Sequence, residues 1–238
     1  THQLCYAVSD YPMKGFTFGG IIVSNGDVGY QGRTEEEKLM SVGNNHGGLV
    51  QVKGQWYIFY HRHTSLNQYN RQGCAERVYF QEDGSIPQVT ITTSGMNTDP
   101  LSGNAAYPAV YCCNLTNGHM GALSSLGRSN PEADFPYLAC EKEERYIENI
   151  KKGTLIGYKY INLKETKRIE VIYKTDREGI MEIHTKADGE KCGTILMNPS
   201  KQWNSAGTEI QFGDEKELYL IYKGSGTVSL LTIHLKNA

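Results

Sequence analysis

Short stretches of alternating apolar and polar residues run through most of the chain, and Gly, Pro, Asn or Asp residues separate them. Alternation with a period of two is typical of β-strands that bury one face. In the first hundred residues the pattern predicts strands at residues 4–9, 16–23, 49–53, 55–61, 77–81 and 89–93. Residues 34–40 are the only helix-like stretch. Gly54 separates two predicted strands and indicates a hairpin.

The stretch 55–61 is apolar or aromatic on both of its faces, which is typical of a strand that is packed on two sides. We therefore expect Trp56 and Tyr57 to belong to a core. The six cysteines form no C-x-x-C pair, so we expect them to be small buried apolar residues. Cys112 and Cys113 are adjacent, and alternation would place them on opposite faces of a strand.

Between residues 94 and 136 the composition shifts to Gly, Asn, Ser and Pro, with one apolar patch at 107–113. This stretch is expected to be an ordered linker or a strap that lies on a domain. The last hundred residues return to strand patterns, and turn residues separate them at regular intervals. The strands are predicted at 154–161, 168–173, 180–185, 193–197, 208–212, 217–222 and 227–235. About seven short strands at such spacing indicate a β-sandwich.

The net charge of −2 and the scattered Lys and Arg residues predict neither a nucleic-acid partner nor an acidic arm. No apolar run approaches the roughly 20 residues that cross a bilayer, so no membrane span is expected. No signal peptide is visible, and the chain opens without Met almost directly into a predicted strand. We interpret this start as a cut end, which leaves the location open.

Three motifs in the first hundred residues occur in a characteristic order. They are residues 5–10 (CYAVSD) with 15–20 (GFTFGG), residues 43–48 (GNNHGG) before the hairpin to 61, and residues 71–76 (RQGCAE) before 83–86 (DGSI). In this order they resemble the late blades of the five-bladed propeller of bacterial family 43 glycoside hydrolases. The likeness is greatest to members that act on xylan-type or arabinose-bearing substrates. It implies an inverting glycosidase, with an oligosaccharide of the xylan or arabinan type as partner.

The resemblance also implies roles for individual residues. His46 matches a histidine near the propeller axis that contacts a bound calcium or its water; the alternative is a hydrogen-bonded core histidine. Arg71 matches an arginine that binds sugar hydroxyls, for which a planar guanidinium with five donors is suited. Its alternative is a surface or ion-pair arginine. Asn45 and His61 are expected to line the same substrate cleft, with His63 at the rim, and the alternative is a metal site on His61 and His63.

Catalysis requires two carboxyl groups across the scissile bond, about 6.5–9.5 Å apart in an inverting enzyme. In the resembled family these groups come from blades that precede the segment matching residues 5–10. The acidic residues present are poor substitutes, because Asp10 and Asp27 sit at turns, 35–37 is a solvated run and Glu76 follows the arginine motif. We therefore expect no catalytic residue in this sequence, and an N-terminal catalytic segment or second chain as partner. The alternatives are a non-catalytic carbohydrate-binding protein and a structural remnant without a ligand.

The C-terminal part resembles family 6 carbohydrate-binding modules at residues 153–158, 201–203 and 218–226. Trp203 matches a residue that stacks on sugars, and its Gly/Ser/Asn-rich surroundings predict a loop; the alternative is a core tryptophan. Leu155 and Ser229 replace the Trp and the amide of the resembled modules, which favours a structural role for this domain. The resemblance assigns Glu141 and Glu143 to a structural calcium, whose preferred ligands are oxygens.

Together these observations predict an all-β fold, with part of a five-bladed propeller followed by a jelly-roll-like sandwich. The expected boundaries are 1–101 for the late propeller blades, 102–136 for the strap and 137–238 for the sandwich. Export to the periplasm or cell surface is implied by the resemblance alone, and a cytoplasmic location is left open.

Overall fold

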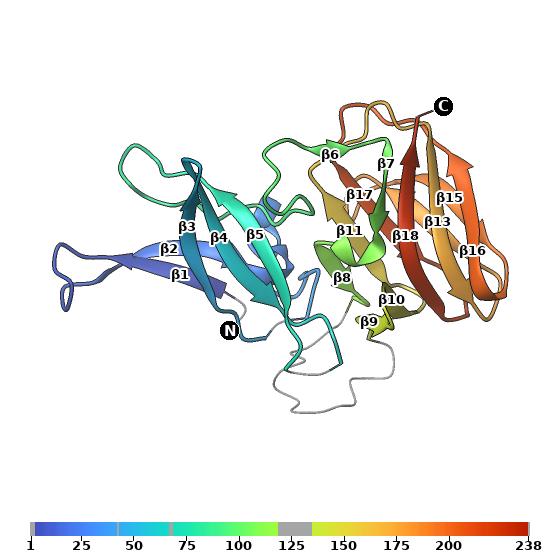
Figure 1. Ribbon diagram of the computed structural model, residues 1–238, viewed down its shortest axis with the longest axis horizontal. Helices are drawn as coiled ribbons and strands as arrows, with labels where there is room; N and C mark the ends of the chain where they lie inside the picture. Colours follow the sequence, from blue (N-terminus) through green and yellow to red (C-terminus); the bar gives the residue numbers. More distant parts are fainter. Residues whose placement is uncertain (1–2, 42, 67–68, 119–134, 238) are drawn as a thin grey trace.

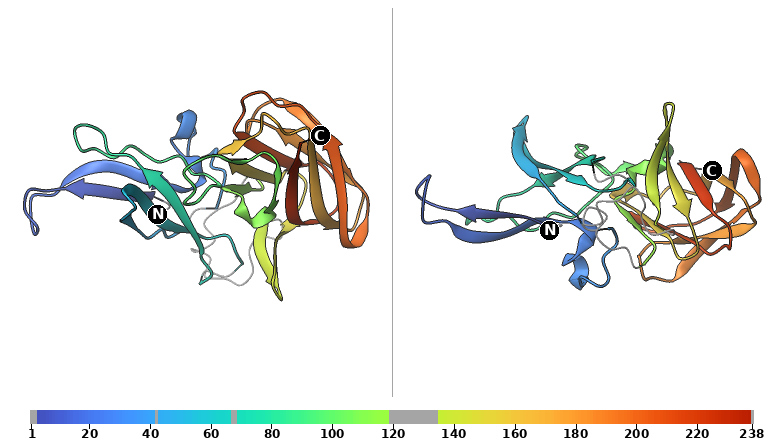
Figure 2. Two further views of the ribbon diagram at one scale, coloured as in Figure 1. Left: turned by 45° about the horizontal axis from the view of Figure 1, so that its top comes forward. Right: turned by 90° about the horizontal axis from the view of Figure 1, so that it is seen from below.

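The computed structural model describes residues 3–41, 43–66, 69–118 and 135–237. The chain is all-β, as predicted, and its sheets form two regions that lie side by side in all views (Figures 1 and 2). We call the first region, with strands β1 to β5, the propeller portion, and the second, with two packed sheets, the sandwich. None of the described helices is long and apolar enough to cross a membrane.

The propeller portion consists of two small antiparallel sheets that do not close into a ring. One sheet pairs β1 with β2, and the other has the order β3-β4-β5. The strands are β1 (Gln3–Val8), β2 (Thr17–Ser24), β3 (Gly47–Val52), β4 (Gln55–Arg62) and β5 (Gln72–Val78). The short 3-10 helices η1 (Asn25–Asp27) and η2 (Tyr30–Gly32) follow β2.

The predicted hairpin at Gly54 is confirmed. Lys53 and Gly54 connect β3 to β4, with φ angles of 50° and 85°. Positive φ at both residues is what a two-residue hairpin turn with the correct twist requires, and Gly adopts it without steric cost. Tyr57 is buried and Trp56 is half-buried against the core, whereas Phe59 is 37% exposed, so β4 is covered less completely on one face than predicted.

The sandwich packs a six-stranded sheet on a five-stranded sheet. The first has the order β16-β13-β18-β10-β9 with β7 added beside β18, and the second has the order β15-β14-β17-β11-β8. A short parallel pair joins β6 to β12. The strands are β6 (Leu101–Ser102), β7 (Ala105–Pro108), β8 (Asn114–Thr116), β9 (Tyr137–Glu141), β10 (Glu144–Ile150), β11 (Leu155–Lys159), β12 (Ile161–Asn162), β13 (Arg168–Thr175), β14 (Gly179–His184), β15 (Lys191–Met197), β16 (Ser200–Glu209), β17 (Glu217–Tyr222) and β18 (Val228–Lys236).

The stretch expected to be a strap contributes strands to both sheets of the sandwich. β7 pairs with β18 and β8 pairs with β11, while the 3-10 helix η3 (Ala109–Tyr111) connects them. Cys112 is buried in the sandwich core and Cys113 in the propeller core, so the two residues do face opposite ways. All six cysteines are free, but Cys5, Cys140 and Cys192 are exposed, contrary to the expected burial.

Two predicted elements are not formed, and two predicted strands are displaced: 77–81 overlaps only the end of β5, and 208–212 overlaps only the end of β16. Residues 34–40 form a turn instead of a helix, because the Glu37 carboxylate accepts hydrogen bonds from the Thr34 backbone N–H and hydroxyl. The second error is the strand at 89–93. This segment crosses from one region to the other, where Val89 N–H donates to Ile22 O and Thr93 N–H donates to Lys159 O. The segment therefore makes one backbone hydrogen bond to each region instead of the regular series of hydrogen bonds that a strand forms with its neighbour.

A buried ion pair ties the two regions together. Lys159 of β11 lies 2.6 Å from the Asp27 carboxylate, and both side chains are 2% exposed. Asn114 Nδ2 also donates to Asp27 at 2.8 Å. Burial acts to lower the pKa of Lys159, but the Asp27 charge, the hydrogen bond to Asp27 and the other acidic groups nearby together outweigh it, and the pKa lies above its ordinary value. The ammonium is therefore charged, and the junction is fixed by a desolvated pair with a further hydrogen bond.

Candidate functional site

Three histidines form a row at one end of the β3–β4 hairpin, which we call the histidine row. His46 immediately precedes β3, His61 lies near the end of β4 and His63 follows that strand. The ring centroids are 5.2 Å apart for His46 and His61, and 5.6 Å apart for His61 and His63. His46 is exposed, His61 is half-buried and His63 is buried, so the row leads from the surface into the protein.

Hairpin geometry explains why these residues meet. β3 and β4 are antiparallel and pair Gly47 with Tyr60, which brings His46 next to His61 across the sheet. The Asn45 side-chain oxygen accepts the backbone N–H of His61 at 3.4 Å. Asn45 is therefore held in place by the neighbouring strand.

Arg71, just before β5, brings a positive charge to the histidine row. Burial lowers the pKa of His61, and the charge of Arg71 lowers it further. The same two causes, in the same order, lower the pKa of His63 to about 4. At neutral pH these imidazoles are neutral, and each ring then offers one donor and one acceptor. A guanidinium beside neutral imidazoles is chemically suited to bind hydroxyl groups.

Arg71 itself is exposed and lines a cavity of about 530 Å³ where the propeller portion meets the sandwich. The cavity is lined from the propeller side by the end of β4 and the start of β5, and from the sandwich side by Tyr111, Leu138, Cys140 and Arg145. No Asp or Glu is among its described lining residues. The described part of the cavity can therefore bind a polar ligand but offers no carboxyl group for proton transfer.

The structure places Asn45 and His46 beside His61, and Arg71 close enough for its charge to act on His61, although only Arg71 among these residues lines the cavity. Trp203 lies elsewhere. Trp203 is in β16, the outermost strand of its sheet, on the side of the sandwich away from the propeller portion (Figure 1). The loop predicted for it is wrong, because residues 200–209 pair along β13. Its side chain is half-buried, its Nε1 donates to Glu144 Oε2 at 2.9 Å, and the Lys174 ammonium lies 4.0 Å from its ring.

The two glutamates expected to bind calcium lie in the β9–β10 hairpin. Glu141 ends β9, Glu143 is in the connecting turn, and both are exposed. The described residues contain no group of three or more His, Cys, Asp or Glu side chains arranged to hold a metal ion. Among the described residues, these glutamates and His46 therefore belong to no such group, and the expected calcium stays a prediction.

Sequence analysis missed a buried carboxyl group. Glu76 of β5 is 3% exposed, and both of its oxygens accept hydrogen bonds from Thr92, from the backbone N–H at 2.8 Å and from the hydroxyl at 2.7 Å. Burial raises the pKa of Glu76 to about 7, although these hydrogen bonds oppose the shift. Cys74 and Val78 share its face of the strand, and this alternation is the signal in the sequence that placed Glu76 inward.

The chain has relatives of known type over almost its whole length. It is 39% identical over 241 residues, covering 98% of this chain and 51% of the relative, to a protein named xylosidase/arabinosidase from Thermoclostridium stercorarium. It is 23% identical over 253 residues, covering 97% of this chain and 35% of the relative, to an arabinoxylan arabinofuranohydrolase from Paenibacillus polymyxa. The chain thus spans about half the length of the first relative and about a third of the second. No protein-family model matches it.

Among solved structures, the fold matches a glycoside hydrolase family 43 arabinoxylan arabinofuranohydrolase from Bacillus subtilis, solved in complex with cellotetraose. The match has a TM-score of 0.53 and 16% identity, and it covers 100% of this chain and 48% of that chain. A family 6 carbohydrate-binding module from Clostridium stercorarium, solved with cellobiose, matches at a TM-score of 0.48 and 13% identity, over 60% of this chain and 100% of that chain. The predicted resemblance is confirmed: the chain is a homologue of the xylosidase/arabinosidase glycoside hydrolases and has the fold of part of a family 43 enzyme.

Proposed function

We propose that this chain is part of a glycoside hydrolase that cleaves β-xylosyl or α-arabinofuranosyl linkages of plant polysaccharide by an inverting mechanism. The observation that carries the proposal is the proximity of His46 to His61, with Arg71 close enough for its charge to act on His61. The relatives named xylosidase/arabinosidase and arabinoxylan arabinofuranohydrolase support the choice of substrate.

In this proposal Arg71 binds hydroxyl groups of the sugar next to the scissile bond, and Asn45 and His61 line the same cleft. A charged, planar donor that faces neutral acceptors can bind vicinal hydroxyls in a fixed orientation. Burial and the Arg71 charge keep His61 neutral, so its ring can accept a hydrogen bond from a sugar hydroxyl. A calcium ion near His46 would fit the resemblance, and its ligands would include backbone oxygens or groups outside the described residues.

The catalytic acid and base are proposed to come from polypeptide outside this chain. The cavity beside Arg71 has no carboxylate among its described lining residues. The propeller portion also carries large exposed apolar side chains on open sheets, including Val8 at 54% and Phe18 at 67%. Isolated sheets with such faces are expected to pack against further structure. An N-terminal segment that completes the propeller would cover them and supply the two carboxyl groups.

The test is hydrolysis of aryl β-xyloside and aryl α-arabinofuranoside by this chain alone, and by a longer protein in which an N-terminal half precedes it. We expect turnover only in the longer protein. Replacing Arg71→Ala there should lower kcat/KM by at least about 100-fold, a loss of about 3 kcal/mol of transition-state stabilisation. The matched control is Arg168→Ala, which removes an exposed arginine from the sandwich and should leave the rate unchanged. Turnover by this chain alone, or full activity of the Arg71 variant, would refute the proposal.

The second candidate is a non-catalytic carbohydrate-binding protein, favoured by the same absence of carboxylates from the described lining of the Arg71 cavity. It predicts that oligosaccharides bind to the chain while neither protein hydrolyses the aryl glycosides. Inverting chemistry is tested separately by following the anomer released by the longer protein by NMR, where the first product should have the configuration opposite to that of the substrate.

A further inference from the structure

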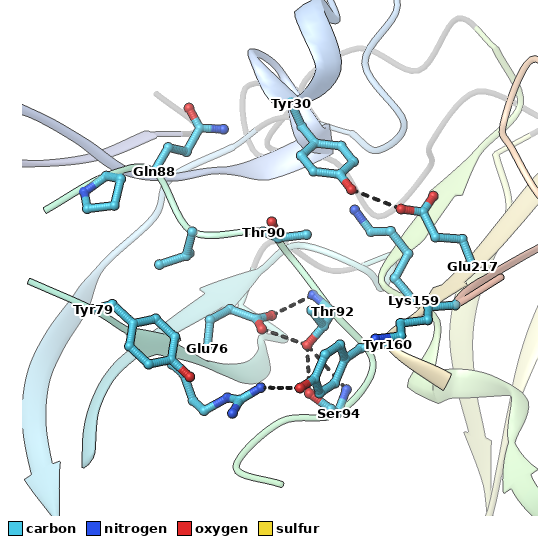
Figure 3. Close-up of a pocket in the computed structure, with 14 residues that line it drawn as sticks. Tyr30, Glu76, Tyr79, Gln88, Thr90, Thr92, Ser94, Lys159, Tyr160 and Glu217 are labelled. Carbon is cyan, nitrogen blue, oxygen red and sulfur yellow. Dashed lines mark hydrogen bonds between the residues drawn. The ribbon is translucent and has the colours of Figure 1, made fainter. Parts of the chain in front are cut away.

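We propose that a second carbohydrate site, separate from the Arg71 cavity, lies in the cleft where the propeller portion meets the sandwich, and that it binds a neutral oligosaccharide. We call this the junction cleft (Figure 3). Its volume of about 470 Å³ is in the range of small-molecule sites. The inference goes beyond the proposed function, which enters only through the choice of sugars for the test.

The junction cleft is built from three parts of the chain that lie far apart in sequence. The propeller portion contributes residues at the end of β5 and Tyr30 of η2, the crossing segment contributes 87–94, and the sandwich contributes Lys159, Tyr160, Lys216 and Glu217. None of these residues lines the Arg71 cavity. The two sites are therefore physically distinct, and a variant at one can leave the other intact.

Hydrogen bonds and ring contacts fix the lower wall of the cleft. Arg77 donates to the Tyr160 hydroxyl at 2.6 Å, and its guanidinium lies 5.1 Å from the Tyr160 ring centroid and 5.9 Å from that of Tyr79. Figure 3 shows Tyr79 and Tyr160 along the same side of the cleft. A guanidinium between two aromatic rings is held rigidly, so a ligand would not have to order this wall on binding.

The opposite wall is fixed in the same way. The Tyr30 hydroxyl donates to Glu217 at 2.9 Å, and the Lys159 ammonium lies 4.4 Å from the Tyr30 ring centroid (Figure 3). Lys159 is in turn held by its ion pair with Asp27. Both walls thus depend on contacts between the propeller portion and the sandwich, and the cleft exists only where the two regions meet.

The lining favours a sugar over other ligands. Tyr79 is 56% exposed and offers an aromatic surface at the rim, on which the apolar face of a pyranose ring can lie. Thr90 provides a hydroxyl, and Gln88 provides an amide whose Nε2 is anchored to Val28 O at 2.9 Å. Groups that both donate and accept hydrogen bonds match sugar hydroxyls.

The charge of the lining indicates a neutral ligand. The lining cations are Arg77, Lys159 and Lys216, and the lining anions are Glu76 and Glu217. Lys159 is neutralised by Asp27, which does not line the cleft. Arg77 and Lys216 then face Glu217 and Glu76, and because burial raises the pKa of Glu76 to about 7, the remaining net charge of the lining at neutral pH lies between zero and about +1. A field this weak favours neither a strongly anionic nor a cationic ligand.

Isothermal titration of the full 238-residue chain with xylotetraose and cellotetraose tests the inference, with trigalacturonate as the anionic comparison. The variants are Tyr79→Ala, which changes the junction cleft, and Arg71→Ala, which changes the Arg71 cavity. The matched control is Phe80→Ala, which removes the neighbouring aromatic residue, 45% exposed, that does not line the cleft. We expect Tyr79→Ala to weaken one binding event by at least about tenfold, while Arg71→Ala and Phe80→Ala leave that event unchanged.

Binding that is lost in Arg71→Ala but retained in full by Tyr79→Ala would overturn the inference and support the proposed Arg71 site. Loss only in Tyr79→Ala would support the junction cleft and count against the Arg71 site. No binding of either tetraose to the wild-type chain, an equal loss in Phe80→Ala, or tighter binding of trigalacturonate would each overturn the inference. Thermal unfolding of each variant checks that the fold is intact, as expected for side chains this exposed.

Discussion

The two regions of this molecule differ most in how completely they cover their apolar residues. In the described part of the chain, the sandwich core contains 26 buried residues from both sheets and the adjoining segments, whereas the propeller core contains 8. Among the described residues, 12 of the 14 large apolar side chains that remain exposed precede residue 100. The sandwich thus buries its apolar side chains far more completely than the propeller portion does.

This difference indicates that the sandwich stabilises the propeller portion. The propeller portion gains buried contacts from residues that belong to the other region, such as Cys113 in its core and Lys159 against Asp27. Arg62 of β4 also donates to the backbone oxygens of Cys112 and Cys113. The stability of the smaller region therefore depends on the junction, and changes there should have the largest effects.

Replacing Lys159→Met should have the largest effect, about 3–5 kcal/mol less free energy of unfolding, because the Asp27 charge would stay buried without its partner. Urea unfolding, followed by tryptophan fluorescence of Trp56 in one region and Trp203 in the other, measures the loss. We expect the Trp56 signal to unfold first in the variant. The exposed pair of Arg168 and Glu209 is the control, since Arg168→Met should cost about 0–1 kcal/mol.

Leu220→Ala in the sandwich should cost about 2–5 kcal/mol, because the residue is fully buried between the two sheets. Ile58→Ala in the propeller portion should cost less, since side chains beside an open sheet can move into the space that is created. The free energies of unfolding of the two variants, measured in urea, compare the two cores directly. Equal losses of unfolding free energy in the two variants would contradict the proposed difference between the two cores.

The stability of the propeller portion should depend on pH through the protonation of Glu76. Its pKa in the folded chain is raised to about 7, above the ordinary value of 4.5, so the folded state holds a proton that the unfolded state has lost. The resulting stabilisation is complete below pH 4.5 and is lost as the pH rises through 7. Glu76→Gln removes this dependence, and its advantage over the wild type should grow by about 2–3 kcal/mol between pH 4.5 and 8. Parallel stability curves for the two proteins would refute the assignment.

The smallest effect on stability is expected for Phe18→Ser, because this side chain is 67% exposed and touches little of the core. The free energy of unfolding should change by less than about 0.5 kcal/mol. Self-association should fall, since an exposed apolar residue on a two-stranded sheet favours contacts between chains. Analytical ultracentrifugation measures the association, and Leu196→Ser, which changes a similarly exposed residue of the sandwich, is the control.

Local pattern was enough to predict most of the fold. The strands predicted at 55–61, 168–173 and 217–222 lie within two residues of the observed ends of β4, β13 and β17. The segment 89–93 alternates equally well but is not a strand, since its bonding groups are divided between two regions. The strand β16 was predicted too far along the chain. The polar residues around Trp203 suggest a loop, yet they pair with β13 along an exposed sheet edge.

The candidate site was predictable only in part. The resemblance located Asn45, His46, His61 and Arg71, and the β3–β4 register explains why the first three lie together. The junction cleft could not be predicted, because its walls join residues such as Tyr30 and Glu217 that are 187 positions apart. No local pattern indicates such a pairing, which depends on how two regions pack against one another.

The Asp27–Lys159 pair, whose members are 132 positions apart, has a consequence for protein engineering. The sandwich cannot be exchanged for an unrelated domain as if only a flexible linker connected it to the propeller portion. A replacement would have to bring its own cation to the same spot, or Asp27 would have to be exchanged together with it. Chimeras that keep this ion pair should express as stably folded proteins. Those that remove one partner should be cleaved more readily by proteases between the two regions.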